Sequence, residues 1–160
     1  MTSPLTLNVL TAERRTTLFA GEQLILLLDG IALDGLLDSL AKGREMIGLL
    51  PTLAGSIDRA EAAIVERRFL PPDGEITITP LLMCPDDLDF SCTLVVTEAI
   101  SRSDLVEWKR IGIDQSAWNA DPELRIGQRV DWLSGIRPFR FARGDFVRIL
   151  AAFDAERSRL

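Results

Sequence analysis

The densest group of acidic side chains in the chain lies between two apolar segments and consists of Asp86, Asp87 and Asp89. Carboxylate loops that bind calcium have ligands at alternate residues, a central glycine and a closing glutamate. The spacing Asp-Asp-Leu-Asp lacks all three features, so we expect no metal here. Two interpretations stay open: the carboxylates solvate the loop and keep the adjoining strands soluble, or they contact a basic partner.

Two cysteines, Cys84 and Cys92, flank this acidic group. They are too few for the disulfide framework of a small secreted domain, and their spacing is neither the two-residue redox motif nor a zinc half-site with partners. We expect a reduced pair that packs as small buried hydrophobes. A redox switch is the alternative if the two residues lie on adjacent strands.

The absence of histidine and tyrosine narrows the chemistry further. Without an imidazole the chain has no Ser-His-Asp or Cys-His triad, no histidine-ligated metal and no imidazole proton shuttle. An enzyme would depend on carboxylates, lysine, arginine or a thiol. No stretch carries a complete catalytic signature, so we expect no enzymatic activity and no cofactor.

The charge of the chain is acidic and unevenly distributed. Its formal net charge is -6, which argues against nucleic acid and anionic membrane as partners, since both require clustered lysine and arginine. Residues 71–135 contain 12 acidic and 5 basic side chains, whereas residues 136–160 contain 6 arginines and 3 acidic side chains. A single-signed central surface favours encounter with a basic protein.

Apolar periodicity predicts one domain over residues 1–160 in the α+β class, a largely antiparallel sheet with about three helices packed on it. The length of 160 residues and the 47% of hydrophobic residues suit one core. Ser56 is the expected cap of the second helix. Helices are predicted over 33–41, 57–69 and 144–156, strands over 5–9, 23–28, 128–133 and between 75 and 114, and turns or loops over 13–21, 48–55 and 115–127.

A four-residue connection over 101–104, which ends in Asp104, predicts a hairpin between strands 94–100 and 105–111. A tight turn would place Glu98 opposite Glu107, and two like charges in that position destabilise a strand pair. Either the register is shifted by one residue, or the sheet keeps a negative site for a partner to neutralise.

Of the three tryptophans, Trp118 is the best candidate for an exposed anchor. It lies in a polar loop, and tryptophan is enriched among the hot spots of protein interfaces. Trp108 and Trp132 fall on predicted strands, where we expect them to pack in the core or on the sheet.

A resemblance covers the central third of the chain. The segment Cys84-Pro85-Asp86-Asp87 with Phe90 and Cys92, the strand over 94–96 and the segment 106–114 resemble small bacterial immunity proteins. These are the cytosolic antidotes encoded beside polymorphic or contact-dependent growth-inhibition toxins. The resemblance implies a compact, acidic, non-catalytic protein that binds a toxin domain at its active site or at an exosite. Because such toxins are often basic nucleases, an acidic surface can stand in for the phosphate backbone.

These observations together predict an immunity protein located in the cytoplasm, with a cognate toxin domain as its partner. The N-terminus shows no basic segment followed by a long apolar core, so we expect no signal peptide. A thiol-dependent redox enzyme using the two cysteines and an adaptor subunit of a larger assembly are the alternatives, and the oligomeric state stays open. The predicted partner-binding residues are Asp86, Asp87, Asp89, Glu98, Asp104, Glu107 and Trp118.

Overall fold

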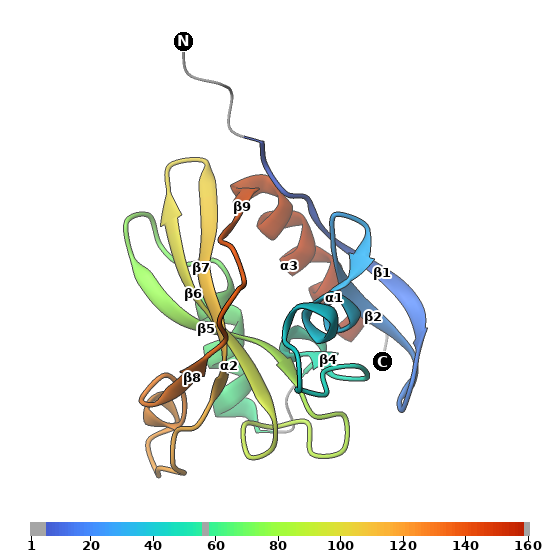
Figure 1. Cartoon of the computed structure of the whole chain (residues 1–160), viewed down its shortest axis with the longest axis vertical. Helices are drawn as coiled ribbons and strands as arrows, with labels where there is room; N and C mark the ends of the chain where they lie inside the picture. Colours follow the sequence, from blue (N-terminus) through green and yellow to red (C-terminus); the bar gives the residue numbers. More distant parts are fainter. Residues whose placement is uncertain (1–5, 56–57, 159–160) are drawn as a thin grey trace.

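Two antiparallel sheets and three α-helices make up the structure, which confirms the predicted α+β class (Figure 1). The computed structural model describes residues 6–55 and 58–158. Within these residues, no helix is long and apolar enough to cross a membrane. The elements in chain order are β1 (Leu10–Thr17), β2 (Gly21–Leu28), β3 (Ile31–Ala32), α1 (Leu33–Leu40), β4 (Leu50–Pro51), η1 (Thr52–Ala54), α2 (Arg59–Phe69), β5 (Ile76–Met83), β6 (Leu94–Arg102), β7 (Leu105–Asp114), η2 (Pro122–Arg125), β8 (Val130–Trp132), β9 (Phe139–Ala142) and α3 (Arg143–Arg157).

The smaller sheet has the strand order β1-β2-β3. Two predictions for the N-terminal part of the chain are wrong. β1 pairs with β2 along its whole length, so residues 13–17 form a strand where a turn was predicted. Their side chains are mostly exposed and show no apolar alternation, but the backbone still completes the ladder. In the described part of the segment predicted as a strand over 5–9, we find only an isolated bridge between Asn8 and Phe141.

The larger sheet has the order β4-β5-β6-β7-β8, and β9 pairs with another part of β7. Its central strands β5, β6 and β7 come from the β-branched runs that predicted them. Pro80 lies next to a shift of register between β5 and β6, which is one of the few places where a sheet tolerates proline. The chain between β5 and β6 forms the acidic loop, residues 84–93.

The hairpin of β6 and β7 has neither of the registers considered above. Glu107 pairs with Ile100, and Glu98 pairs with Arg110. The predicted opposition of Glu98 and Glu107 is therefore wrong. The connection is shorter than predicted, because Arg102 pairs with Leu105 and only two residues form the turn, which shifts the register by two positions. An irregularity directly after Glu98 then accommodates Lys109 as an extra residue on β7 and brings an arginine to the acidic position.

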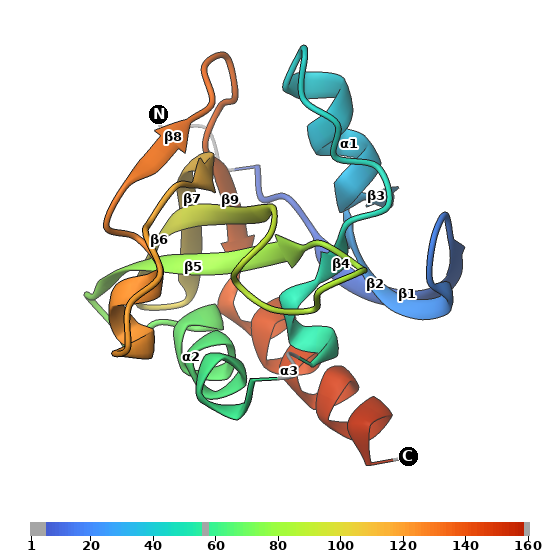
Figure 2. The same ribbon diagram turned by 90° about the horizontal axis from the view of Figure 1, so that it is seen from below.

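Helices α2 and α3 lie side by side on one side of β5, and α1 lies on the other side of the molecule (Figure 2). Phe69 of α2 and Phe146 of α3 pack with ring centroids 5.0 Å apart. Trp108 is fully buried and lies 4.7 Å from Phe141 in an edge-on arrangement. Trp132 is half-buried under the guanidinium group of Arg110. Both tryptophans thus pack as predicted.

Local signals place the helices well. α1 and α3 match their predicted ranges closely, and α2 ends at Phe69 as expected. Asp58 caps α2, because its side chain accepts hydrogen bonds from the backbone N–H groups of Ala60 and Glu61. The predicted cap, Ser56, lies outside the described residues.

Candidate functional site

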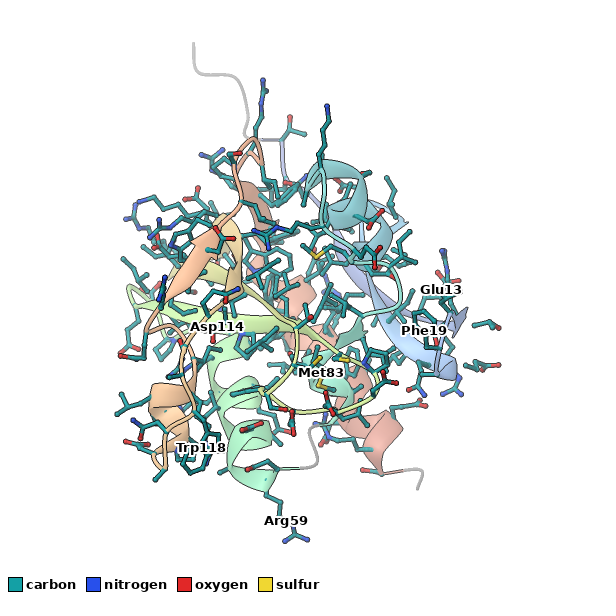
Figure 3. All side chains as sticks on the ribbon, turned by 60° about the horizontal axis from the view of Figure 1, so that its bottom comes forward. Glu13, Phe19, Arg59, Met83, Asp114 and Trp118 are labelled. Atoms are coloured by element: carbon teal, nitrogen blue, oxygen red, sulfur yellow. The ribbon has the colours of Figure 1, made fainter. Side chains whose placement is uncertain are left out.

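A pocket of about 310 Å³ brings two predicted site residues together, Asp89 of the acidic loop and Trp118 of the loop after β7. Helix α2 and the 3₁₀ helix η2 supply the remaining walls, and Trp118 lies beside them in Figure 3. The pocket is lined by Asp58, Glu61, Asp89, Phe90, Ser91, Ser116, Trp118 and Arg125.

The acidic loop is held against α2 by a buried carboxylate. Phe90 is 8% exposed, and its backbone N–H donates to Oε1 of Glu61 over 2.9 Å. The backbone N–H of Leu88 donates to the carbonyl of Cys84 over 3.1 Å. Asp89 accepts hydrogen bonds from the backbone N–H and the hydroxyl of Ser91. These contacts fix the path of the loop at the pocket.

Arg125 links the floor of the pocket to Trp118. Its guanidinium donates to Oε2 of Glu61 over 2.8 Å and to Oδ2 of Asp58 over 3.2 Å. The hydrogen bond with Glu61, aided by Asp58, raises the pKa of Arg125 above its ordinary value. The backbone N–H of Glu61, aided by Arg125, holds the pKa of Asp58 below its ordinary value. Arg125 therefore stays charged and paired.

Trp118 projects from the surface, as the sequence predicts. It is 73% exposed, and the guanidinium of Arg125 lies 4.9 Å from the centre of its ring. This cation–π contact restrains one face of the indole and leaves most of the ring in water. An exposed, partly ordered tryptophan loses little side-chain entropy when a partner covers it.

Sequence reasoning missed the three other charged residues of this pocket, Asp58, Glu61 and Arg125. The first two carry a local signal, since Asp58 and Glu61 occupy the cap and third positions that a capping box would use. Glu61 instead turns to Phe90 and Arg125. Arg125 lies 64 positions further along the chain than Glu61, so no local pattern could reveal its pairing.

Asp86 and Asp87 are exposed in the acidic loop, and neither forms an ion pair with any described residue. Asp87 lies beside both cysteines. The Sγ atoms of Cys84 and Cys92 and a carboxylate oxygen of Asp87 all lie within 4.8 Å of one another. Among the residues that the structure describes, these three side chains form a group that could hold a metal ion.

The expectation that both cysteines are buried is wrong. Cys84 is half-buried and Cys92 is exposed, and both thiols are free. They meet because Cys84 directly follows β5 and its backbone N–H donates to the carbonyl of Thr93, just before β6. A hydrogen bond to Cys84, together with burial and Asp87, raises the pKa of the Cys92 thiol above its ordinary value.

The remaining predicted residues lie on the β6–β7 hairpin, and two of the three are already paired with arginines. Glu98 forms an ion pair with Arg110 over 2.9 Å, and Glu107 with Arg140 over 2.7 Å. Glu107 lines a different pocket of about 400 Å³, together with Arg140 and three residues of the β6–β7 hairpin. Asp104 is exposed in the turn. None of these three residues lines the pocket of Trp118.

Comparison with known proteins adds no relative. No protein-family model matches the chain, and searches of curated proteins and of solved structures return no significant match.

Proposed function

We propose that this chain is a non-catalytic immunity protein of the cytoplasm that binds and neutralises a cognate toxin domain, a basic nuclease. The observation that carries the proposal is the placement of Trp118 and Asp89 on one pocket, with two exposed carboxylates, Asp86 and Asp87, on the same loop as Asp89. We call the surface formed by Asp86, Asp87, Asp89 and Trp118 the Trp118 face.

Charge and exposure support this surface as the binding site. Arg125 is engaged by Glu61 and Asp58, so it does not offset the three aspartates of the acidic loop. An aromatic anchor surrounded by carboxylates suits a partner that presents lysine and arginine around a groove. The anchor supplies apolar contact, and the carboxylates supply steering and register.

Glu98, Asp104 and Glu107 have a smaller part in this proposal. Two of them are neutralised by arginines across the sheet, and exposed pairs of this kind contribute little free energy to an interface. They add to the overall negative field that accelerates encounter with a basic protein.

The thiol chemistry favours this function over a thiol-dependent enzyme. A nucleophilic or redox-active cysteine needs a lowered pKa, which basic neighbours or a helix N-terminus provide. The pKa of Cys92 is raised, and the charged group beside it is the anionic Asp87.

Co-expression with the product of the adjacent upstream reading frame tests the proposal. We expect a stoichiometric complex with the C-terminal domain of a large toxin, and survival of cells that express both proteins. Cell death despite expression of this chain would contradict immunity. A stoichiometric complex with a harmless protein would instead assign the adaptor role.

A further inference from the structure

Two thiols and one carboxylate converge at the base of the acidic loop. The Sγ atoms of Cys84 and Cys92 and a carboxylate oxygen of Asp87 lie within 4.8 Å of one another. Ligand atoms around one tetrahedral zinc ion lie roughly 3.5–3.8 Å apart, given its bond lengths of about 2.3 Å to sulfur and about 2.0–2.2 Å to oxygen. Small rotations of these side chains are enough to place all three donors around a single ion.

The backbone holds the three residues in this arrangement. Met83 at the end of β5 pairs with Leu94 at the start of β6, and the ladder continues through the hydrogen bond from Cys84 N–H to the carbonyl of Thr93 over 3.2 Å. The N–H of Leu88 donates back to the carbonyl of Cys84, which closes a turn containing Asp87. The donors are therefore brought together before any ligand arrives, and little ordering remains for binding to impose.

The donor set selects the kind of ligand. We propose that Cys84, Asp87 and Cys92 form a binding site for a thiophilic divalent cation such as zinc. Thiolate sulfur favours zinc over magnesium and calcium, whose preferred ligands are oxygen atoms only. Three protein ligands leave a fourth tetrahedral position for water. Cys92 is exposed, so an ion can enter from solvent.

The same neighbours make a cation a better match than a reactive thiol. An aspartate carboxylate beside two sulfur atoms offers none of the positive charge that a reactive thiolate needs, whereas it is a ligand and a counter-charge for a metal ion. Binding needs no oxidant: one zinc ion replaces the two thiol protons, which leave to solvent, and the product is a bis-thiolate complex.

Titration of the full chain, reduced with a phosphine, with cobalt(II) and then zinc(II) tests the site. We expect one ion per chain and a thiolate-to-cobalt charge-transfer absorption in the near ultraviolet, which zinc abolishes on displacement. Cys84→Ser, Cys92→Ser and Asp87→Asn should each weaken zinc binding at least tenfold, the loss that even an outer-shell partner of a metal ligand causes. Asp86→Asn is the matched control and should bind zinc as the wild type does.

Circular dichroism of each variant shows whether the fold is kept, which we expect because the altered side chains are half-buried or exposed. Cobalt binding without the charge-transfer band would overturn the proposal, as would wild-type zinc affinity in the Cys84→Ser/Cys92→Ser double variant. A rate of Cys84–Cys92 disulfide formation by hydrogen peroxide that excess zinc leaves unchanged would also overturn it, because coordination to a metal ion slows the oxidation of a thiolate.

Discussion

Trp118 combines high exposure with a fixed position. Arg125 covers part of its ring, and the side chain is otherwise open to water. Truncation should therefore leave folding almost unchanged, within about 0.5 kcal/mol, and act on binding alone. Substitution of Trp118 therefore measures its contribution to the interface without a change in the stability of the core.

We expect Trp118→Ala to weaken binding of the toxin domain by about 2 kcal/mol or more, because buried tryptophan anchors dominate interface free energies. Isothermal titration calorimetry measures this loss, and thermal unfolding checks the fold. Leu124→Ala is the control, since Leu124 lies on the neighbouring η2 and is 41% exposed. Equal affinities of the Trp118→Ala and Leu124→Ala variants would remove Trp118 from the interface.

The cap of helix α2 gives stability a defined dependence on pH. The backbone N–H of Glu61, aided by Arg125, lowers the pKa of Asp58. A lowered folded-state pKa stabilises the protein above the unfolded-state value, and this contribution is lost as pH falls through the folded-state pKa. The affected range thus lies below about pH 4, the ordinary value for aspartate.

Asp58→Asn keeps a side chain that can cap the helix but cannot titrate. We expect its free energy of unfolding to fall less than that of the wild type between pH 5 and pH 2.5, as measured by urea denaturation at each pH. Asp154→Asn, which removes a carboxylate of α3 that is 79% exposed, should retain the wild-type dependence. Parallel profiles for Asp58→Asn and wild type would show that this carboxylate does not govern the acid limb.

At the scale of elements, the close packing of β8 on β7 depends on Gly112, which has no side chain. A Cβ atom on Gly112 of β7 would lie 2.7 Å from both the carbonyl oxygen of Asp131 and Cγ1 of Val130. Since one of these neighbours is backbone, β8 would have to move. We expect Gly112→Ala to destabilise the protein by about 1–3 kcal/mol, the usual cost of overpacking.

Gly35→Ala is the matched control for that substitution. Gly35 lies inside α1, and no atom lies within 4 Å of a Cβ built on it. Alanine in an open helical position should stabilise by about 0.5–1 kcal/mol. Urea denaturation compares the two variants, and a shift of the same sign for both would refute the close packing of β8 on Gly112.

Sequence patterns predicted the long elements that bury an apolar face and missed a long strand that does not, as well as the two-residue strand β4 in the predicted loop over 48–55. The run over 23–28 and the helical spacing over 33–41 and 144–156 report directly on packing against the core, and the structure contains all three elements. Residues 13–17 carry polar side chains and join the sheet through their backbone. Apolar periodicity depends on side chains alone, so it does not predict a strand that is held mainly by backbone hydrogen bonds.

In the candidate site, too, sequence predicted some features and missed others. The position of Trp118 in a polar loop was sufficient to predict its exposure. The partners of Glu98 and Glu107 depended on a two-residue turn between β6 and β7 and, for Glu98, on an irregularity of one residue in β7. The meeting of Asp58, Glu61 and Arg125 depended on contacts across more than 60 residues. Apolar patterning reveals neither, because the first depends on the details of strand pairing within one hairpin and the second on the packing of α2 against η2.

At the scale of the whole molecule, the net charge is -6. A basic partner could respond to this total charge at long range or to the carboxylates of the Trp118 face by direct contact. Asp86 and Glu45 are both exposed, and neither forms an ion pair with a described residue. Asp86→Lys and Glu45→Lys change the net charge equally. Only Asp86 belongs to the Trp118 face, so the pair separates local contact from long-range steering.

We expect Asp86→Lys to weaken toxin binding about tenfold at low ionic strength, and Glu45→Lys to lower only the association rate, by a factor of about two, since a remote charge acts through the field. The difference between the variants should shrink in 1 M salt, where the screening length falls to about 3 Å. Surface plasmon resonance over a salt series gives both rates. Identical behaviour of the two variants would mean that the toxin responds to total charge, and the binding site would then have to be sought outside the acidic loop.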